Sequence, residues 1–290
     1  MDAKIAVIAR VGAHRVFAGA GLAEISMLVP KTPFGSSNPI HLFEHGSVQF
    51  AVLSRHGEEG YAVSAPFVND RANLWALKNL GIEKIISWSA PGSIDPNISP
   101  GDLVVPEDML DWGQGARREL ATFFDGHGQG VIRSNPAFCP ELRSAFLEVL
   151  QEKPFRTHEG GVYAATAGPR METAAEVSAM AGMGASLVGM TLSPELWLAR
   201  ELELCYAAVC YSVNYAEGIA DRPFRGGILF EGLATEEEME RVSTVEAAFA
   251  DIVLSLLPAV AATSRECPCP NLLERYYRRG DLTSDWWRVL

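Results

Sequence analysis

Apolar and polar residues alternate along the chain in blocks that suit strands and helices in turn. Residues 4–9, KIAVIA, form an apolar, β-rich run typical of a buried first strand. Two more strand-like runs, 41–45 and 48–57, are joined through a Gly-containing turn, which predicts a hairpin. Residues 69–82 have apolar positions at helical spacing, a polar cap at the start and a glycine at the end, and so predict a helix.

Strand-like and helix-like segments continue to alternate beyond this helix. The pattern predicts strands at 84–90, 160–167, 185–190 and 204–213, and helices at 140–151, 173–184, 194–203 and 241–257. Such alternation favours crossover connections in a largely parallel sheet covered by helices, which is an α/β fold.

The chain is expected to form one domain, because no repeat or low-complexity segment interrupts the pattern. We place that domain at 1–263 and a C-terminal extension at 264–290. The extension ends LTSDWWRVL, and two exposed tryptophans in a loose tail would be unusual. It is therefore expected to pack on its own core or on a neighbouring subunit.

Composition narrows the class of partner. The 290 residues are 48% hydrophobic and carry a net charge of −12. Such a chain lacks the clustered positive surface charge that proteins binding nucleic acid need. A small-molecule or protein partner is expected instead. No leader-like segment opens the chain and no apolar run reaches the roughly 20 residues of a spanning helix, so we expect a cytoplasmic protein without membrane contact.

The cysteines are five in number and unevenly spaced. They are Cys139, Cys205, Cys210, Cys267 and Cys269, a set that suits a reducing compartment better than a disulfide scaffold. A zinc site at Cys267 and Cys269 needs two further ligands, and nothing close in sequence supplies them. We therefore expect no metal, and a local redox pair or two plain thiols.

One acidic residue stands out at the start of the helix at 173–184. Thr173 and Glu176 fit a capping box, which explains Glu176 structurally. Glu172 lies one position earlier, at the carboxyl end of a predicted strand, where open α/β sheets place their ligand contacts. The alternative for Glu172 is a solvated carboxylate near a positive helix end.

Other polar residues also follow predicted strands. Arg55 and His56 end one strand, and an Arg fork beside a His suits phosphate, although two surface polar residues would look the same. Ser89 and Ala90 form a small-residue turn that can hold an anion by hydroxyl and amide donors. Thr191 ends another strand and is not explained by the following helix start.

Asn214 follows a strongly apolar strand. Asn in this position usually makes a turn. Its carboxamide can also donate and accept in one plane, which reading a heterocyclic base requires.

Taken together, the motifs resemble those of the trimeric purine nucleoside phosphorylase and methylthioadenosine phosphorylase family. The resemblance covers residues 4–258 and rests on TPFGSS, SRHG, NDRANLWALK, PGDLVVPEDMLD, FFDG, AGPRMETAAE, GMTLSPELWLARE and CYAAVCYSVNYAEG. It implies a single-domain α/β fold with a mixed central sheet flanked by helices, assembled as a homotrimer or a dimer of trimers. It also implies phosphorolysis of a purine nucleoside, with inorganic phosphate as co-substrate and no metal or organic cofactor.

The resemblance further implies a role for each site residue. Asn214 and His56 are the expected catalytic residues, and His127 is expected to reach the 5′ end of a neighbour's substrate. The expected phosphate ligands are Arg55, His56, Ser89, Ala90 and Thr191; Met190 orients the ribose; and Met171, Glu172 and Asn214 surround the purine.

Two residues predict preference for a 6-oxopurine. An ionised Glu172 accepts from N1–H of a 6-oxopurine but would face a lone pair on adenine, and Asn214 can donate to N7 or O6. Members that prefer adenine generally have Ser at position 172 and Asp at 214 and 216. At the 5′ end, the segment 227–242 contains no His, and its Leu233 and Met239 suggest an apolar pocket for a methylthio group.

The first strand departs from the family pattern. Where relatives have a Gly-Gly-Ser/Thr-Gly phosphate loop, this chain has ARVG at 9–12. Val11 has no hydroxyl, while Arg10 is expected to replace the missing contact with charge. The missing hydroxyl motivates one alternative, a nucleoside hydrolase on the same scaffold. A second alternative, from another class, is a purine or nucleoside binding protein that has lost catalysis.

Overall fold

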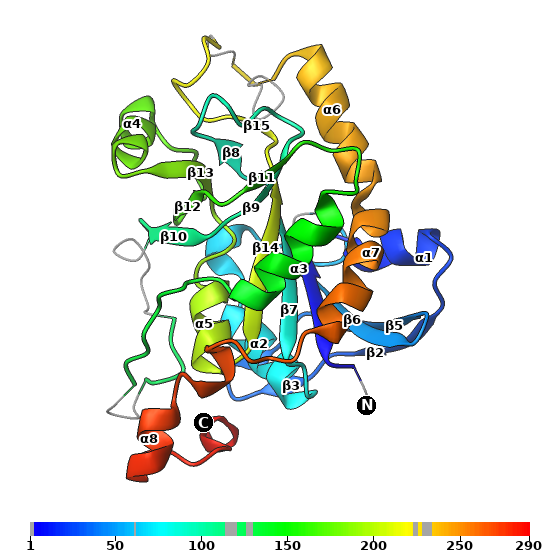
Figure 1. Ribbon diagram of the computed structural model, residues 1–290, viewed down its shortest axis with the longest axis vertical. Coiled ribbons are helices and arrows are strands. Elements are labelled where there is room, and N and C mark those ends of the chain that lie inside the picture. The colour runs from blue at the N-terminus through cyan, green and yellow to red at the C-terminus, as the bar shows by residue number, and fades with distance from the viewer. Residues whose placement is uncertain (1–2, 61, 114–120, 126–129, 223–225, 228–233) are drawn as a thin grey trace.

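A mixed sheet of eight strands forms the centre of the protein (Figure 1). The computed structural model describes residues 3–60, 62–113, 121–125, 130–222, 226–227 and 234–290. In spatial order the strands are β11 (Thr157–Glu159), β9 (Leu103–Val105), β14 (Cys205–Tyr211), β7 (Lys84–Ser89), β1 (Ile5–Ala9), β6 (Val48–Ser54), β5 (Ile40–His45) and β2 (Glu24–Leu28). β14, β7, β1 and β6 run parallel, while the β5–β6 hairpin and the β9–β14 pair are antiparallel. The expected mixed α/β fold is confirmed.

A second sheet of five strands lies against one end of the first. Its order is β10 (Asp108–Asp111), β12 (Val162–Ala165), β13 (Ala185–Gly189), β8 (Gly92–Ser93) and β15 (Asn214–Tyr215). A further two-stranded ribbon joins β3 (Lys31–Thr32) and β4 (Gly35–Ser36). Because β7 continues into β8 and β14 into β15, the chain passes between the two large sheets at two adjacent points, where β8 and β15 pair in parallel.

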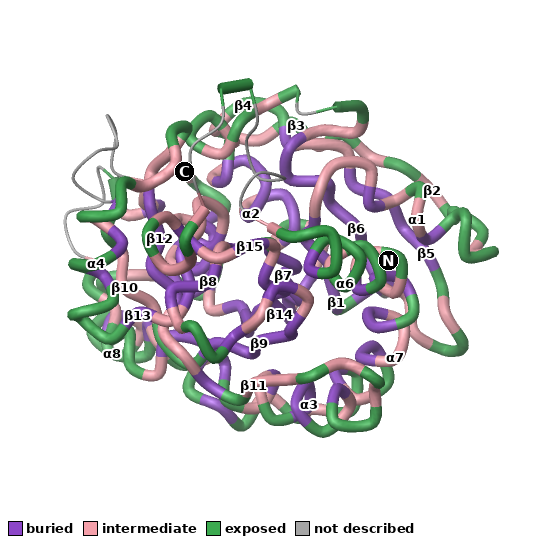
Figure 2. Tube along the Cα trace, turned by 90° about the horizontal axis from the view of Figure 1, so that it is seen from above, coloured by how far each residue is buried: buried purple, intermediate pink, exposed green. Residues whose placement is uncertain are grey.

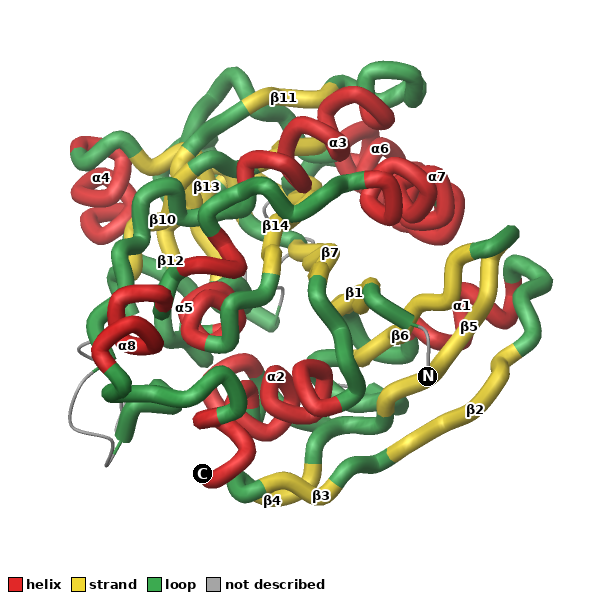
Figure 3. Tube along the Cα trace, turned by 60° about the horizontal axis from the view of Figure 1, so that its bottom comes forward, coloured by secondary structure: helices red, strands yellow, loops and turns green. Residues whose placement is uncertain are grey.

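Helices cover both faces of the larger sheet (Figure 3). One face carries α1 (Ala13–Gly19), α3 (Pro140–Leu150) and α7 (Phe249–Ala262), and the other carries α2 (Asp70–Asn79) and α5 (Glu195–Glu201). Strand residues alternate between the two cores: Ile5 and Val7 of β1 face α3 and α7, while Ala6 and Ile8 face α2 and α5. The inner strands β1, β7 and β14 are buried from both sides, as the central purple segments in Figure 2 show.

Most of the helices expected from sequence are present. The cap of α2 is Asn69, whose side chain accepts from the Ala72 N–H, and α4 (Ala174–Gly182) begins with the capping box of Thr173 and Glu176. The single helix expected at 241–257 was wrong. Two helices, α6 (Glu236–Ala247) and α7, occupy this region and meet at a bend of 47°.

The bend follows from the different surfaces of the two helices. α7 is apolar and buries seven residues against the core, whereas α6 is rich in Glu and buries only Glu238 and Val245. Ala248 therefore caps both helices, and α6 leaves the sheet that α7 covers. No single described helix is long and apolar enough to cross a membrane, and only the bent pair of α6 and α7 reaches that length and composition together.

The segment after α7 returns to the core. It contains α8 (Glu274–Arg279) and two short 3-10 helices, Cys269–Asn271 and Trp286–Val289. The Trp75 indole donates to the carbonyl of Trp287 at 2.8 Å, and Trp286 stacks on Phe124 with ring centroids 5.1 Å apart. Both C-terminal tryptophans are buried against the same core as α2 and α5.

Candidate active site

Polar residues gather where the two large sheets meet. Ser89 is the last residue of β7 in the first sheet, and Thr191 lies two residues beyond β13 in the second. Their hydroxyl oxygens are 2.8 Å apart, although the residues are 102 positions apart in sequence. The Tyr163 hydroxyl lies 3.5 Å from the Thr191 hydroxyl, and Ala90 is exposed beside this group. Hydroxyls and the exposed Ala90 therefore line the rim.

Arg55, at the end of β6, is held by a buried carboxylate. Its Nε donates to Glu195 Oε2 at 3.0 Å and its Nη2 to Glu195 Oε1 at 2.9 Å, with 3% and 1% of the two side chains exposed. Nη2 also donates to the Ser87 hydroxyl and Nη1 to the Trp88 carbonyl. Four of the five guanidinium N–H groups are thus used internally, which leaves one for a ligand.

The environment keeps Arg55 charged. Burial alone would lower the pKa of its guanidinium, but the charge and hydrogen bonds of Glu195 outweigh burial and raise it above the ordinary value. Glu195 Oε1 also accepts from Ser87 and from the Tyr206 hydroxyl. The pair has little net charge, so a ligand at this rim meets much less positive potential than a bare Arg would supply.

His56, the next residue, is neutral at physiological pH. Its Nδ1 lies 3.0 Å from the Val63 carbonyl oxygen, and only 6% of the residue is exposed. Burial first, and then the positive charge of Arg55, lower the pKa of the imidazole to about 4. His56 can therefore act on a ligand as a neutral hydrogen-bonding group.

The ARVG turn adopts a compact form without a hydroxyl of its own. Gly12 has a φ of 64°, a left-handed conformation that favours glycine, and it begins α1. The Ala13 N–H donates to the buried Ser54 hydroxyl at 3.1 Å. The Arg10 side chain is 41% exposed and its Nη1 lies 3.9 Å from Glu246 Oε1, a loose contact. Arg10 therefore has a guanidinium free enough to meet an anion.

Asn214 is buried at the junction of the two sheets. It is 2% exposed and pairs with Gly92 in the parallel ladder of β15 and β8. A Cβ at position 92 would lie 2.8 Å from the Asn214 Oδ1, so Gly92 makes room for the carboxamide. Within the described part of the chain, no residue hydrogen-bonds this carboxamide. Its donor and acceptor are both available to a ligand.

Glu172 lies in a pocket of about 220 Å³ that Trp112 and Thr166 also line. The Thr166 hydroxyl donates to Glu172 Oε1 at 2.5 Å. Oε2 has no hydrogen-bond partner among the described residues. Glu176 lines the same pocket, but both its oxygens are engaged by Arg170 at 2.8 and 2.6 Å. Of the two acids, Glu172 is the one with a free acceptor.

The remaining expected site residues are less informative. Met190 follows β13 and packs against Gly168, where an added Cβ would lie 2.5 Å from its sulfur. Met171 is half-buried beside Glu172, and Met239 is 37% exposed on α6. His127 and Leu233 lie outside the described residues, so the expected 5′ pocket is described only at Met239.

Sequence reasoning missed three residues that support the site. They are Glu195, which holds Arg55; Thr166, which orients Glu172; and Tyr163, which lies beside Thr191. Thr166 directly follows the observed strand β12, but it lies inside the strand predicted at 160–167, so the strand-end signal that identified Thr191 did not single it out. Glu195 had no such signal, because a Glu in the first turn of a helix is ordinarily explained by the helix dipole.

Comparison with known proteins gives the family. Residues 4–258 match the model of the Phosphorylase superfamily. The chain belongs to this superfamily. The match spans most of the chain, including every strand of both large sheets.

Curated relatives and solved structures agree with the assignment. This protein is 36% identical over 276 residues to a probable 6-oxopurine nucleoside phosphorylase of Thermococcus kodakarensis. The alignment covers 92% of this chain and 97% of that one. The protein is 37% identical over 244 residues to a probable S-methyl-5′-thioinosine phosphorylase of Methanopyrus kandleri, with 84% and 89% covered. A methylthioadenosine phosphorylase from an antarctic soil metagenomic library superposes with a TM-score of 0.79 at 25% identity, covering 94% of this chain and 91% of that one.

The low pKa of His56 predicts a specific titration. We expect the imidazole to titrate near pH 4 in an NMR titration, with the signal assigned by its loss in His56→Gln. An unfolded His takes up its proton near pH 6.5. The stability that neutral His56 contributes is therefore complete above about pH 6.5 and is lost as the pH falls towards 4. A midpoint at pH 6 or above would contradict this assignment.

Proposed function

We propose that this protein cleaves the N-glycosidic bond of 6-oxopurine nucleosides with inorganic phosphate, releasing the free purine and a pentose 1-phosphate. The observation that carries the proposal is Oε2 of Glu172, which has no hydrogen-bond partner among the described residues and belongs to a carboxylate held by Thr166 in a pocket beyond β12. A carboxylate oxygen accepts N1–H of a 6-oxopurine and repels the N1 lone pair of adenine. The relatives named 6-oxopurine nucleoside phosphorylases support the same substrate class.

Phosphate is proposed to bind at the rim formed by Ser89, Ala90 and Thr191. In the 2.8 Å hydrogen bond between the two hydroxyls one donates to the other, which leaves one hydroxyl proton for a ligand. His56 and the last N–H of Arg55 lie at neighbouring strand ends. Arg10 supplies the mobile positive charge that the Arg55–Glu195 pair lacks. A bound phosphate then serves as nucleophile and as favourable charge for a sugar that gains oxocarbenium character.

Asn214 is proposed to act on the leaving purine. As the glycosidic bond lengthens, negative charge develops on the base, and a preorganised donor at N7 or O6 stabilises it. The buried Asn214 carboxamide has no described protein partner to give up first. Phosphate and these side chains suffice for the reaction, so no metal or organic cofactor is proposed at the reacting centre.

The 5′ substituent is proposed to include methylthio. Relatives named S-methyl-5′-thioinosine phosphorylases share 37% identity with this chain, and Met239 offers an exposed apolar side chain on α6. An apolar 5′ pocket tolerates a methylthio group at little cost, because a methylene-sized change in such a pocket is worth only about 1–3 kcal/mol.

The first test compares inosine, adenosine and their 5′-methylthio forms, each with and without phosphate. We expect inosine and 5′-methylthioinosine to be cleaved faster than the adenine nucleosides, and only with phosphate, because the nucleophile is the anion. Free purine and pentose 1-phosphate are measured by chromatography. Equal purine release in rigorously phosphate-free buffer would instead identify a hydrolase, and tight nucleoside binding without turnover would identify a binding protein.

Replacing Glu172 tests base selection. We expect Glu172→Ser to lower kcat/KM for inosine about 10–100-fold, the effect of one lost charge-assisted hydrogen bond, and to change adenosine cleavage much less. Glu176→Gln is the matched control, because Glu176 lines the same pocket with both oxygens already engaged. If both variants lost activity equally on both nucleosides, Glu172 would not read the base.

Replacing Arg10 tests the source of positive charge for phosphate. We expect Arg10→Ala to raise the KM for phosphate about tenfold or more, with little change in the KM for nucleoside. Arg15→Ala is the control, because Arg15 is also exposed, on the following helix α1, but is paired with Glu59 at 2.7 Å. An unchanged phosphate KM in Arg10→Ala would remove Arg10 from the site.

A further inference from the structure

Four cysteines that are distant in sequence converge in the core. The sulfur atoms of Cys139, Cys205, Cys267 and Cys269 all lie within 4.8 Å of one another, and all four residues are buried. Cys205 and Cys267 have their sulfurs 3.5 Å apart. From the sequence alone no metal is expected, because nothing near Cys267 and Cys269 supplies two more ligands. The fold supplies them from the start of α3 and the start of β14.

We propose that these four cysteines bind one zinc ion in a structural tetrathiolate site. In such sites each Zn–S bond is about 2.3 Å, which places the sulfurs of a regular tetrahedron roughly 3.8 Å apart. The 3.5 Å between the Cys205 and Cys267 sulfurs is close to that value, and no two of the four sulfurs are more than 4.8 Å apart. On binding, each thiol gives up its proton to solvent and each sulfur donates an electron pair to Zn²⁺.

Hydrogen bonds of their backbone N–H groups hold Cys139 and Cys267 in place without the metal. The Cys139 N–H donates to the Tyr206 carbonyl at 2.8 Å, which fixes Cys139 beside Cys205. On the other side, the Glu141 carboxylate accepts from the N–H groups of Arg265, at 2.9 Å, and of Cys267. One acid in the first turn of α3 thus positions the loop that carries the other two cysteines.

The charge around the cluster suits a tetrathiolate. Four thiolates and Zn²⁺ carry two net negative charges, which burial would make costly without positive neighbours. Two arginines supply them: the side chain of Arg200 interacts with Cys269, and that of Arg265 interacts with Cys205. Each of these arginines also has a buried Nε–H without an acceptor among the described residues. Positive charge and unused donors therefore lie next to the sulfurs.

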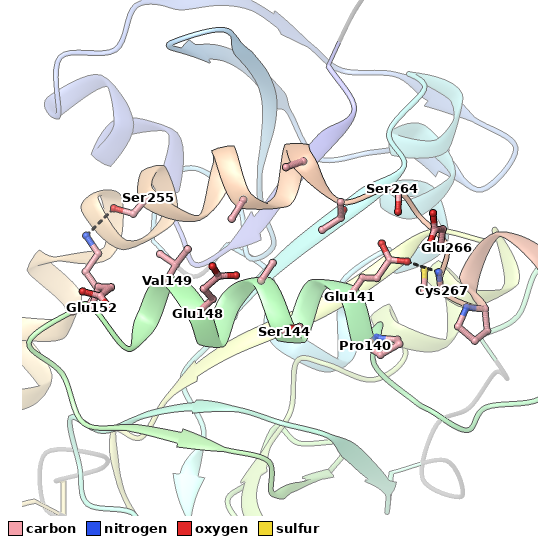
Figure 4. A pocket seen from close by; sticks show the side chains of 16 residues that line it. Pro140, Glu141, Ser144, Glu148, Val149, Glu152, Ser255, Ser264, Glu266 and Cys267 are labelled. Atoms are coloured by element: carbon pink, nitrogen blue, oxygen red, sulfur yellow. Dashed lines mark hydrogen bonds between the residues drawn. The ribbon is translucent and has the colours of Figure 1, made fainter.

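A solvent route reaches the cluster. A groove of about 1210 Å³ runs between α3 and α7, and Cys267 lines one end of it (Figure 4). In this view Cys267 lies next to Glu141, with the hydrogen bond between them drawn. Metal can thus enter from the α3–α7 face without passing the candidate active site.

The position of the cluster makes the zinc structural. Cys205 begins β14, whereas Asn214 follows the opposite end of that strand. Cys267 and Cys269 belong to the segment after α7, so the metal would join that segment to the body of the domain. We therefore expect its loss to affect stability first, and the proposal stands whether or not the chain is a phosphorylase.

The test measures zinc in the full-length protein purified without chelator. We expect about one zinc per chain by elemental analysis, and the visible absorption of tetrahedral cobalt thiolate after exchange with Co²⁺. Cys139→Ser and Cys269→Ser should each retain at least tenfold less zinc after dialysis against a chelator and should unfold at lower temperature. Cys210→Ser is the control, because Cys210 is equally buried in β14 but faces the opposite core.

Three results would overturn the proposal. The first is a zinc content below about one tenth per chain after expression with added zinc and reconstitution under reducing conditions. The second is zinc retained undiminished in the two cysteine variants. The third is disulfide bonds among these cysteines, found by alkylation and mass spectrometry of the wild-type protein prepared under reducing conditions. If the variants fail to fold, wild-type zinc content and the cobalt spectrum still decide the question.

Discussion

The buried pair of Arg55 and Glu195 is the interaction on which the candidate site depends. It joins the end of β6 to the first turn of α5, and its hydrogen bonds extend to Ser87 on β7 and Tyr206 on β14. Both charges are withdrawn from water, so each needs the other: removing one partner would leave an uncompensated buried charge at a cost of roughly 3–5 kcal/mol. The pair thus fixes the strand ends that carry Ser89 and His56.

The same pair determines whether the site attracts a ligand by net charge or by directed hydrogen bonds. Because Arg55 is neutralised by Glu195 and His56 is uncharged near neutral pH, the rim presents mainly hydroxyl, amide and imidazole groups. Such groups bind by directed hydrogen bonds rather than by net charge. Binding at the rim then depends on the exact positions of these groups. The two hydroxyls, which come from different sheets, are held 2.8 Å apart.

The two ends of β14 serve different purposes in this picture. Beyond its carboxyl end, Asn214 offers a carboxamide at the junction of the sheets that no described residue hydrogen-bonds. At its amino end, Cys205 joins a buried cluster that connects α3 and the segment after α7. In a parallel sheet the loops that follow the carboxyl ends of the strands converge on one crevice. Ligand-binding groups therefore gather at that edge, and the opposite ends of the strands are left for stabilising contacts.

The sequence by itself determined the local structure and the residues at strand ends. Apolar periodicity and cap chemistry involve residues within about four positions of each other, so the β5–β6 hairpin, the Asn69 cap and the Thr173 capping box were predictable. Strand ends were equally readable for Ser89 and Thr191, whereas Glu172 lies seven residues beyond the end of β12. The motif resemblance extended this to the family, which the comparison confirmed.

Only the tertiary structure decided which distant groups meet. Glu195 lies 140 residues from Arg55, and Cys205 lies 62 residues from Cys267, so no local pattern could pair them. The bend at Ala248 likewise depends on how α7 packs on the sheet rather than on its own periodicity. These contacts arise because strand order and helix packing, not sequence separation, set which side chains share the interior.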